Sequence, residues 1–328
     1  MPEENKPRMC NLSITLGCKL KCITCYHWQN DERKIVKPTL KQWKDFLFSL
    51  KGHVSSDFTV AFGGGEPLLF PEMLIELISF CSTLGFRTVL STSGFTVTKA
   101  YAQELYKSGL NNINLTIFSL NPETHDYIRG VPGSLQRTLD AIEYLSPFSD
   151  SLKIGINTII MKPSLHELLE LTDWINQDRR FTGLYYQAIM RPFHTVFVED
   201  WHKTQQYRIL WPDNLPELEI VIDALIARKE SGYRISNPVA QFKLFKGFFK
   251  NPAGFVRPYR CNLMNGNFFA INSDGSVHLC PYFQSLGKIM ETGFEHLWNS
   301  EISCQVKGEI AQCKTNCHQL VNCWYEED

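Results

Sequence analysis

Hydrophobic and polar positions alternate in two regular ways over the first 190 residues of the chain. Short apolar runs rich in β-branched residues predict six strands, at 11–16, 58–62, 86–90, 113–118, 154–160 and 184–189. Between these runs, apolar residues recur at helical spacing and predict five helices, at 39–50, 71–84, 98–107, 134–145 and 164–176. Strands that alternate with helices form a parallel sheet with helical crossovers. We therefore expect an α/β fold, a partial (β/α)6 TIM-like barrel.

The regular alternation ends near residue 190. Residues 191–212 show no clear period and are expected to form a loop, whereas 215–228 is expected to be a helix. In the segment 242–250, three phenylalanines fall on one helical face and three lysines on another. This pattern is typical of a helix on a membrane surface or of one packed against the barrel, and the short length favours packing.

The C-terminal part contains two short apolar runs, at 268–271 and 277–279. They flank a turn at 273–276, and the three segments together predict a β-hairpin. A short helix is expected at 294–298. We therefore expect a barrel at 1–190, a connecting segment at 191–254 and a small cysteine-rich domain at 255–328.

Composition and charge narrow the class of protein. The 328 residues are 44% apolar, which suffices for a sizeable core, and carry a net charge of −1. Since no basic block or stripe is present, the charge gives no support for a nucleic-acid partner. The first residues lack the apolar core of a secretory signal, and the most apolar stretch, 68–86, is interrupted by Pro71, Glu72 and Glu76. We expect a cytoplasmic protein without a membrane span.

Eleven cysteines lie mostly at the two ends of the chain. Without a secretory signal, clustered cysteines indicate metal or redox chemistry rather than disulfides. Cys18, Cys22 and Cys25 follow the first predicted strand at CxxxCxxC spacing. Thiolates suit iron–sulfur clusters and zinc, and three of them leave one iron of a cubane cluster open to a small molecule. We favour a cluster over the alternative, a structural zinc with His27 as the fourth ligand.

Polar residues follow three further predicted strands. The second strand ends at Gly64, Gly65 and Glu66, where glycines allow close approach of a ligand and a carboxylate suits an ammonium group. Hydroxyl, amide and guanidinium side chains come after the third and fourth strands, at Ser93, Ser119, Asn121 and Arg129. Because the carboxyl ends of parallel strands meet at one rim, we expect these residues beside the cysteine loop.

This combination resembles the radical SAM superfamily over most of the chain. The resemblance implies that the three N-terminal cysteines bind a [4Fe–4S] cluster and that S-adenosylmethionine (SAM) binds its open iron. Gly64, Gly65 and Glu66 match the GGE motif, which holds the SAM amino group. Ser119 resembles the serine of the ribose-contacting strand, and Arg129 resembles the arginine that meets the SAM carboxylate.

Two positions depart from the family pattern. The aromatic residue often found before the third cysteine is Thr24 here, and Tyr26 just after that cysteine is our candidate for the adenine contact. The usual Thr-Asn-Gly after the third strand is replaced by Thr92-Ser93-Gly94. Ser93 and Asn121 complete the expected cofactor contacts.

The resemblance also implies the reaction. A reduced cluster passes one electron to SAM, which yields methionine and a 5′-deoxyadenosyl radical, and this radical abstracts hydrogen from a substrate carbon. A reducing partner such as flavodoxin or ferredoxin supplies the electron. The sequence identifies no catalytic acid or base, although His194, Glu199 and His202 are candidate substrate-facing groups.

The C-terminal cysteines indicate a second metal site. The predicted hairpin brings Cys261 and Cys280 together, and three further cysteines follow at Cys313, Cys317 and Cys323. Four or more thiolates in a small unit suit a second [4Fe–4S] cluster, and a structural zinc is the alternative.

The spacing within the hairpin resembles the opening of the SPASM/twitch domain found on many radical SAM enzymes. The resemblance implies that Cys261 and Cys280 bind an auxiliary cluster together with two of the last three cysteines. The final cysteines of a full SPASM domain are missing, which favours the shorter twitch form with one auxiliary cluster. We expect Cys304 to lie on a helix face instead.

The expected function is that of a radical SAM enzyme whose auxiliary cluster assists oxidation or bond formation. We expect a small metabolite, such as a sugar or aminocyclitol, as the substrate. A ribosomal peptide is the alternative, which the short sequence before the first strand disfavours because it leaves no room for a leader-binding domain. A further alternative is a non-catalytic iron–sulfur electron carrier. Glu66, Ser119 and Arg129 argue against it, since a carrier needs no amino-acid pocket.

Overall fold

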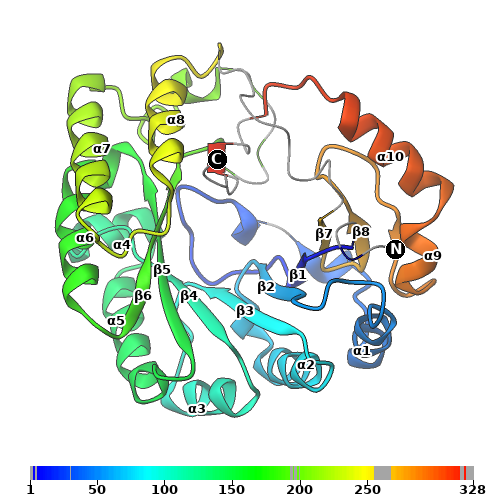
Figure 1. The fold of residues 1–328 in the computed structure, drawn as a ribbon. Helices are drawn as coiled ribbons and strands as arrows, with labels where there is room; N and C mark the ends of the chain where they lie inside the picture. Colours follow the sequence, from blue (N-terminus) through cyan, green and yellow to red (C-terminus); the bar gives the residue numbers. More distant parts are fainter. Residues whose placement is uncertain are drawn as a thin grey trace.

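The computed structural model describes residues 3, 6–29, 31–192, 195, 198, 200–254, 267–317 and 321–322 (Figure 1). Its strands are β1 Met9–Thr15, β2 Thr59–Gly64, β3 Arg87–Thr92, β4 Asn112–Thr116, β5 Lys153–Ile160, β6 Phe181–Ala188, β7 Phe268–Ile271, β8 Ser276–His278 and β9 Gly287–Lys288. Its α-helices are α1 Leu40–Ser49, α2 Pro71–Thr83, α3 Lys99–Lys107, α4 Pro122–Arg129, α5 Ser134–Leu145, α6 Leu168–Gln177, α7 Leu215–Glu230, α8 Val239–Lys250, α9 Phe294–Trp298 and α10 Glu301–Gln312.

Strands β1 to β6 form a parallel sheet in which each strand pairs with the next one in sequence. Figure 1 shows this sheet as a curved wall, with helices α1, α2, α3, α5 and α6 on its outer side. The order of the strands and the helical crossovers confirm the predicted partial barrel. The carboxyl ends of the six strands therefore share one rim, where ligand-binding residues of such folds gather.

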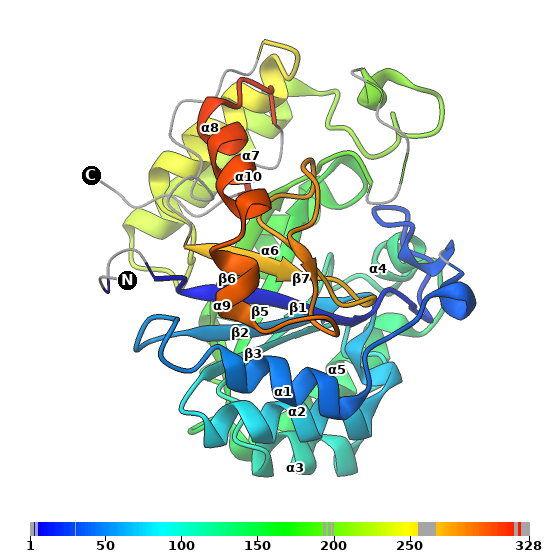
Figure 2. The same ribbon diagram turned by 90° about the vertical axis from the view of Figure 1, so that its right-hand side faces the viewer.

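The predicted C-terminal hairpin extends the same sheet. β7 pairs in parallel with β1 on the side away from β2, with Met9 opposite Phe268 and Leu12 opposite Ile271. β8 and β9 continue antiparallel, so the full order is β6-β5-β4-β3-β2-β1-β7-β8-β9. Figure 2 shows β7 beside β1 and α9 close to both. The strand that leads into the cysteine loop is thus central in the sheet. The division of the chain at residues 190 and 255 stays a prediction.

The two faces of the barrel strands differ in chemistry. Alternate side chains, such as Leu12, Leu90 and Ile113, are buried in the core. The positions between them carry polar side chains that line the inside of the barrel, at Asn11, Ser91, Thr116, Asn157 and Gln187. Strands covered on both faces are apolar throughout, so this alternation indicates that one face borders open space.

Helix α4 is an element that the periodicity does not predict. Its start is fixed by Asn121, whose side chain accepts a hydrogen bond from the Glu123 N–H at 3.0 Å, and by Pro122 in the first turn. Its end is fixed by Gly130, which adopts the left-handed conformation with φ +65°. The helix places Arg129 in its last turn, at the rim of the barrel.

The connecting segment packs against the barrel. The four phenylalanines of α8 at 242, 245, 248 and 249 are buried, and Trp211 lies against the last two with ring centroids 5.4 and 5.1 Å apart. This confirms packing as the role of α8 rather than contact with a membrane surface. Among the described residues, none of the helices combines the length and the apolar character that crossing a bilayer needs.

Candidate active site

Cys18, Cys22 and Cys25 line one cavity of about 440 Å³ at the rim of the barrel. The predicted residues Gly64, Gly65, Glu66, Ser93 and Arg129 line the same cavity, as does the alternative zinc ligand His27. The walls are completed by residues that the sequence reading did not select, including Asn11, Trp28, Thr116, Phe118, Asn157 and Gln187. The structure thus brings the cysteine loop and the ends of five other strands to one site.

The first glycine-rich loop packs directly on the cysteine loop. The Gly65 N–H donates to the Thr15 carbonyl at 2.9 Å, and the Glu66 N–H donates to the Gly17 carbonyl at 2.8 Å. A Cβ atom added to Gly65 would lie only 2.1 Å from the Gly17 oxygen. Gly65 is therefore required by the close approach of two backbones, before any ligand is considered.

A second glycine supports the cysteine loop from the other side. The Lys21 N–H donates to the Arg129 carbonyl at 2.9 Å, and the Ile23 N–H donates to the Ile128 carbonyl at 3.0 Å. Gly130 follows with φ +65°, and an added Cβ would lie 2.4 Å from the Lys21 oxygen. The cysteine loop is thus held between the end of β2 and the end of α4.

Glu32, in the short helix η3 (Glu32–Lys34), anchors the start of the same loop. Its carboxylate accepts hydrogen bonds from the Leu16 N–H at 2.7 Å, from the Gly17 N–H at 3.1 Å and from the Thr15 hydroxyl. Burial acts to raise the pKa of Glu32, but hydrogen bonds from Lys37, Thr15 and Leu16 outweigh it and lower the pKa to about 2. The sequence gives no signal for this residue, because a single glutamate in a polar loop is usually solvated.

The carboxylate of Glu66 is buried and connects the ends of β2 and β3. One oxygen accepts from the Thr92 hydroxyl at 2.7 Å and the Leu68 N–H at 3.3 Å. The other accepts from the Ser93 N–H at 3.0 Å and the Ser93 hydroxyl at 2.5 Å. A carboxylate has about four acceptor positions, so this one is engaged within the protein. Ser93 is held at the cavity by the same bonds.

Arg129 is buried between the cysteine loop and β4. Its Nη2 donates to the Thr116 carbonyl at 2.5 Å, its Nη1 lies 3.7 Å from the Cys22 Sγ, and its guanidinium covers the Phe118 ring at 4.7 Å. Its Nε is buried and has no hydrogen-bond partner among the described residues. A buried donor without a partner is costly, so a bound anionic group would stabilise this side chain.

Three predicted cofactor contacts lie elsewhere in the described part of the chain. Ser119 accepts a hydrogen bond from the Asn121 N–H at 2.8 Å, and Asn121 caps α4, so both act on the helix and neither lines the cavity. Tyr26 stacks on Trp28 and receives a hydrogen bond from Gln206 at 3.0 Å, on the outer side of the loop. Apart from the His27 imidazole, the aromatic rings of described residues that line the cavity are those of Trp28 and Phe118.

The three thiols fit an iron–sulfur cluster by the chemistry of their donor set. Burial raises the pKa of Cys18 to about 11 and that of Cys25 to about 12, so a metal must displace their protons to bind. In a [4Fe–4S] cluster with three protein ligands, each thiolate binds a different iron atom, so the three sulfur atoms lie around the cluster rather than around a single ion. Within the described residues, no three Cys, His, Asp or Glu side chains are close enough to hold a single ion.

The C-terminal cysteines are described only in part. Cys261 and Cys323 lie outside the described residues, as do His194 and Glu199. Burial raises the pKa of Tyr282, and the nearby thiols of Cys317 and Cys280 raise it further, so these two cysteines share one neighbour. Cys313 ends helix α10.

Two further expectations concern single residues in this region. Cys304 is exposed on α10, which confirms its place on a helix face. His202 was expected to face the substrate, but it packs beside Trp211 with ring centroids 4.5 Å apart and does not line the cavity. The tryptophans of this loop, Trp201 and Trp211, form a buried cluster that includes the histidine, and its role toward the substrate stays a prediction.

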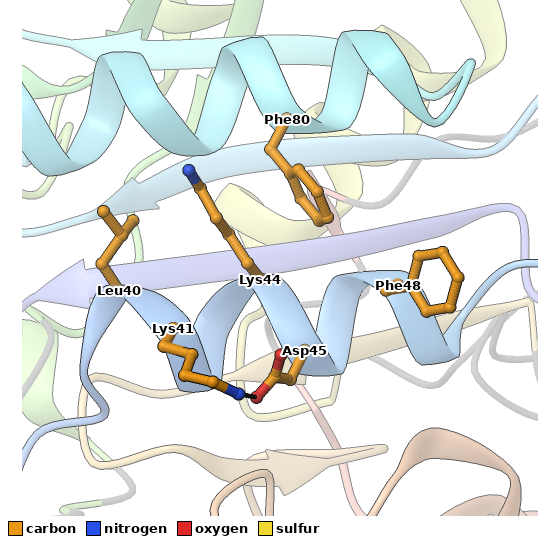
Figure 3. Close-up of a pocket in the computed structure, with 6 residues that line it drawn as sticks. All are labelled: Leu40, Lys41, Lys44, Asp45, Phe48 and Phe80. Carbon is orange, nitrogen blue, oxygen red and sulfur yellow. Dashed lines mark hydrogen bonds and ion pairs between the residues drawn. The ribbon is translucent and has the colours of Figure 1, made fainter.

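Another hollow, of about 670 Å³, contains none of the residues of this site. Figure 3 shows it between α1 and α2, lined by Leu40, Lys41, Lys44, Asp45, Phe48 and Phe80. Lys41 is paired with Asp45 at 2.6 Å, and Lys44 with Glu76 at 2.7 Å. It lies on the outer side of the barrel and contains none of the cysteines.

Comparison with protein families identifies the chain. Residues 12–175 match the radical SAM superfamily, and residues 261–324 match the SPASM iron–sulfur cluster-binding domain. The first match spans half of the chain, and the chain belongs to the radical SAM superfamily. It is an enzyme that uses a [4Fe–4S] cluster and SAM, and its SPASM domain binds an additional iron–sulfur cluster.

Similar proteins agree with this assignment. An AdoMet-dependent heme synthase from Methanosarcina barkeri is 25% identical over 99% of this chain and 96% of its own length. An Fe-coproporphyrin III synthase from the same organism is 22% identical over 95% of this chain and 79% of its own length. The crystal structure of Streptococcus suis SuiB bound to S-adenosylmethionine has a TM-score of 0.67 at 17% identity, over 92% of this chain and 68% of SuiB. The likeness to SuiB shows a shared fold.

Proposed function

We propose that Cys18, Cys22 and Cys25 hold the SAM-binding cluster and that the residues around the same cavity hold SAM. The observation that carries the proposal is the meeting of these thiols with the Gly64–Glu66 loop and Arg129 at one cavity. When bound, the cluster supplies the electron that cleaves SAM to methionine and a 5′-deoxyadenosyl radical, which takes hydrogen from the substrate. The chain orients the cofactor and keeps water away from it.

The individual roles follow from the contacts. The buried Nε of Arg129, which has no partner among the described residues, suits the SAM carboxylate. The main chain of the loop at 63–65 suits the SAM amino group, since an added Cβ on Gly63 would meet nothing within 4 Å. Glu66 acts by holding this loop and Ser93 in place and by adding negative charge near the amino group. Trp28 and Phe118 are aromatic surfaces on which the adenine ring can stack.

Glu66→Gln is expected to weaken SAM binding while the iron content stays unchanged. A glutamine NH2 would face one of the main-chain N–H groups that now donate to the carboxylate, so a hydrogen bond is lost and the loop shifts. The loss of a bond to a charged group costs roughly 1.5–3 kcal/mol. Calorimetric titration of SAM into the reconstituted protein measures the effect, with Glu72→Gln on the exposed surface of α2 as the control. Equal SAM affinity in both variants would contradict the assignment of the loop.

The electron donor and the auxiliary cluster belong to the same proposal. Lys19 and Lys21 are exposed beside Cys18 and Cys22, where they would attract an acidic reductant such as flavodoxin or ferredoxin. The auxiliary cluster is assigned to Cys261 and Cys280 together with two of Cys313, Cys317 and Cys323. One auxiliary cluster and a cytoplasmic location are further parts of the proposal.

The substrate is proposed to be a small molecule. Two relatives that match nearly the whole chain carry names that refer to small molecules, heme and Fe-coproporphyrin III. The cavity walls beyond the cysteines offer neutral hydrogen-bonding groups, at Asn11, Thr116, Asn157 and Gln187, which suit an uncharged polar part of the substrate.

A peptide is the second candidate substrate. The side-chain amides of Asn157 and Gln187 match the amide groups of a peptide main chain. SuiB, which shares the fold, has been seen bound to its precursor peptide SuiA.

The two substrate classes are separated by the coupling of SAM cleavage to a substrate. Purified enzyme with SAM and dithionite is incubated with a low-molecular-mass cell extract, before and after protease treatment of the extract, and 5′-deoxyadenosine is measured. We expect stimulation that survives the protease, and Fe-coproporphyrin III serves as the first defined probe. Stimulation that the protease removes would overturn the small-molecule proposal in favour of a peptide. Cys22→Ala is the control and should give no 5′-deoxyadenosine with either extract.

A further inference from the structure

Strand β6 is a terminal strand of the sheet, and its outer edge is covered partly by main chain and partly by side chains. In a parallel sheet the N–H and C=O groups of alternate residues point to the same edge. On the outer edge of β6 these are the groups of residues 184, 186 and 188. An edge left unpaired would be available to other strands, so proteins cover or interrupt such edges.

The first pair is covered by main chain. The Leu184 N–H donates to the Arg234 carbonyl at 2.9 Å, and the Ser236 N–H donates to the Leu184 carbonyl at 2.9 Å. This short segment forms a parallel bridge opposite Ile235 and then turns away into α8.

The next two pairs are covered by asparagine side chains. The Asn237 carboxamide accepts from the Tyr186 N–H at 2.7 Å and donates to the Tyr186 carbonyl at 2.9 Å. The Asn322 carboxamide does the same at Ala188, at 2.7 and 2.8 Å. A carboxamide presents the same N–H and C=O pair as a peptide group. After residues 234–236 have turned away from β6, the two side chains therefore supply the hydrogen bonds that a neighbouring strand would make.

The two asparagines are joined by further hydrogen bonds. Gln241 accepts from the Asn237 amide at 2.7 Å and donates to the Val321 carbonyl at 3.1 Å. The Tyr185 hydroxyl donates to the Asn322 carbonyl at 2.8 Å. Asn237 and Gln241 are both completely buried. A buried polar network in which the members are satisfied fixes one arrangement of the parts that it joins.

The position of Asn322 in the chain gives this network a consequence for chemistry. Asn322 directly precedes Cys323 and follows Cys317, two of the cysteines assigned to the auxiliary cluster. On the barrel side, its partner Ala188 follows Gln187, whose side chain lines the active-site cavity. One side chain thus connects the C-terminal cysteine segment to a wall of the cavity.

We propose that Asn322 is a positioning residue that locks the C-terminal cysteine segment onto the edge of β6 and thereby fixes the auxiliary cluster relative to the cavity. The positioning of the cluster rests on the proposed function, because it requires that the C-terminal cysteines bind one. The lock itself rests only on the hydrogen bonds at Ala188.

The lock is tested by hydrogen exchange of the peptide that spans 183–190. Asn322→Ala removes both hydrogen bonds to Ala188. We expect the Ala188 amide hydrogen to exchange about tenfold faster in this variant than in the wild type. Asn111→Ala is the control, because the Asn111 side chain also accepts a main-chain N–H bond, from Thr88 at 2.7 Å, beside β3 rather than on this edge. It should leave the exchange of 183–190 unchanged. Equal exchange in wild type and Asn322→Ala would overturn the lock.

The positioning role is tested in a background that lacks the first cluster, with Cys18, Cys22 and Cys25 all replaced by alanine. We expect Asn322→Ala to shift the electron paramagnetic resonance spectrum and the reduction potential of the remaining cluster, and Asn111→Ala to leave both unchanged. An unaltered spectrum and potential despite faster exchange at Ala188 would overturn the positioning role. A background protein without bound iron would overturn the auxiliary cluster itself, whereas the exchange experiment would still decide the lock.

Discussion

Gly65→Ala is expected to abolish incorporation of the first cluster. The added Cβ would lie 2.1 Å from the Gly17 oxygen and 2.5 Å from the Leu16 carbonyl carbon, and both are main-chain atoms that cannot rotate away. The clash would push the β2 loop away from the cysteine loop and break the hydrogen bonds to Thr15 and Gly17. Overpacking typically costs about 1–3 kcal/mol, and a clash with main-chain atoms lies at the upper end of this range, so we also expect a lower melting temperature.

Gly63→Ala is a matched control for this change. Gly63 lies two residues away in the same loop and strand, and an added Cβ there would meet nothing within 4 Å. Iron and sulfide content after anaerobic reconstitution and the melting temperature are measured for both variants. We expect Gly63→Ala to bind iron like the wild type. If Gly65→Ala also binds iron normally, the cysteine loop does not depend on this backbone contact.

The glycine and glutamate residues of the motif show which features of the site the sequence reveals and which it does not. The motif positions of Gly64, Gly65, Glu66 and Arg129 lead to one shared cavity, because residues at the carboxyl ends of neighbouring parallel strands must share a rim. Their contacts are less visible in the sequence. Gly65 and Gly130 are needed for two backbones to approach the cysteine loop, and Glu66 is engaged by hydroxyls and N–H groups of the neighbouring strand.

Ser119 and Asn121 are predicted as cofactor contacts from their position alone, and the structure shows that both also act at the start of α4. Both directly follow a barrel strand, which is the usual place of ligand-binding residues. Asn121 also precedes Pro122, however, and an Asn-Pro pair is a strong signal for the start of a helix. The N–H groups in the first turn of α4 need acceptors, and the Asn121 side chain points toward the N–H of Glu123. Ser119 accepts the Asn121 N–H and so stabilises the same turn.

Asn157 and Gln187 show a signal that was present but not used. Each lies in a strand where polar and apolar residues alternate, while a sheet covered on both faces has apolar strands. The polar positions of β4, β5 and β6 therefore mark the inner face of the barrel. By contrast, the parallel pairing of β7 with β1 joins segments more than 250 residues apart. No local pattern encodes such a contact.

The other large expected effect separates the two ends of the chain. Cys22→Ala is expected to lower 5′-deoxyadenosine formation by more than about 100-fold, with dithionite as the reductant. Replacing a residue that only hydrogen-bonds to a metal ligand typically lowers activity by about 10- to 100-fold, and loss of a ligand itself should cost more. Cys22 is buried at the cavity, 3.7 Å from the Arg129 guanidinium. Without this thiolate only two ligands remain, so we expect that the cluster whose open iron would bind SAM does not assemble stably.

Cys280→Ala is expected to behave differently, because Cys280 lies beyond β8, two strands away from β1 in the sheet. SAM cleavage should remain measurable but should no longer be coupled to substrate, so that 5′-deoxyadenosine forms with little product. Small metal-binding units often fold only with metal bound, so a cooperative melt must be shown for the variant before its activity is compared.

The comparison of the two cysteine variants has three informative outcomes. Normal product formation by folded Cys280→Ala would mean that the auxiliary cluster has no part in turnover. Loss of SAM cleavage in that variant, with the first cluster still bound, would mean that the two sites do not act separately. The hydrogen bonds from Asn322 to Ala188 provide a physical route for such dependence, since they tie the C-terminal segment to the strand that bears Gln187. Uncoupled cleavage in Cys280→Ala and loss of cleavage in Cys22→Ala would support separate roles, with electron transfer to SAM at the first cluster and substrate oxidation or binding at the second.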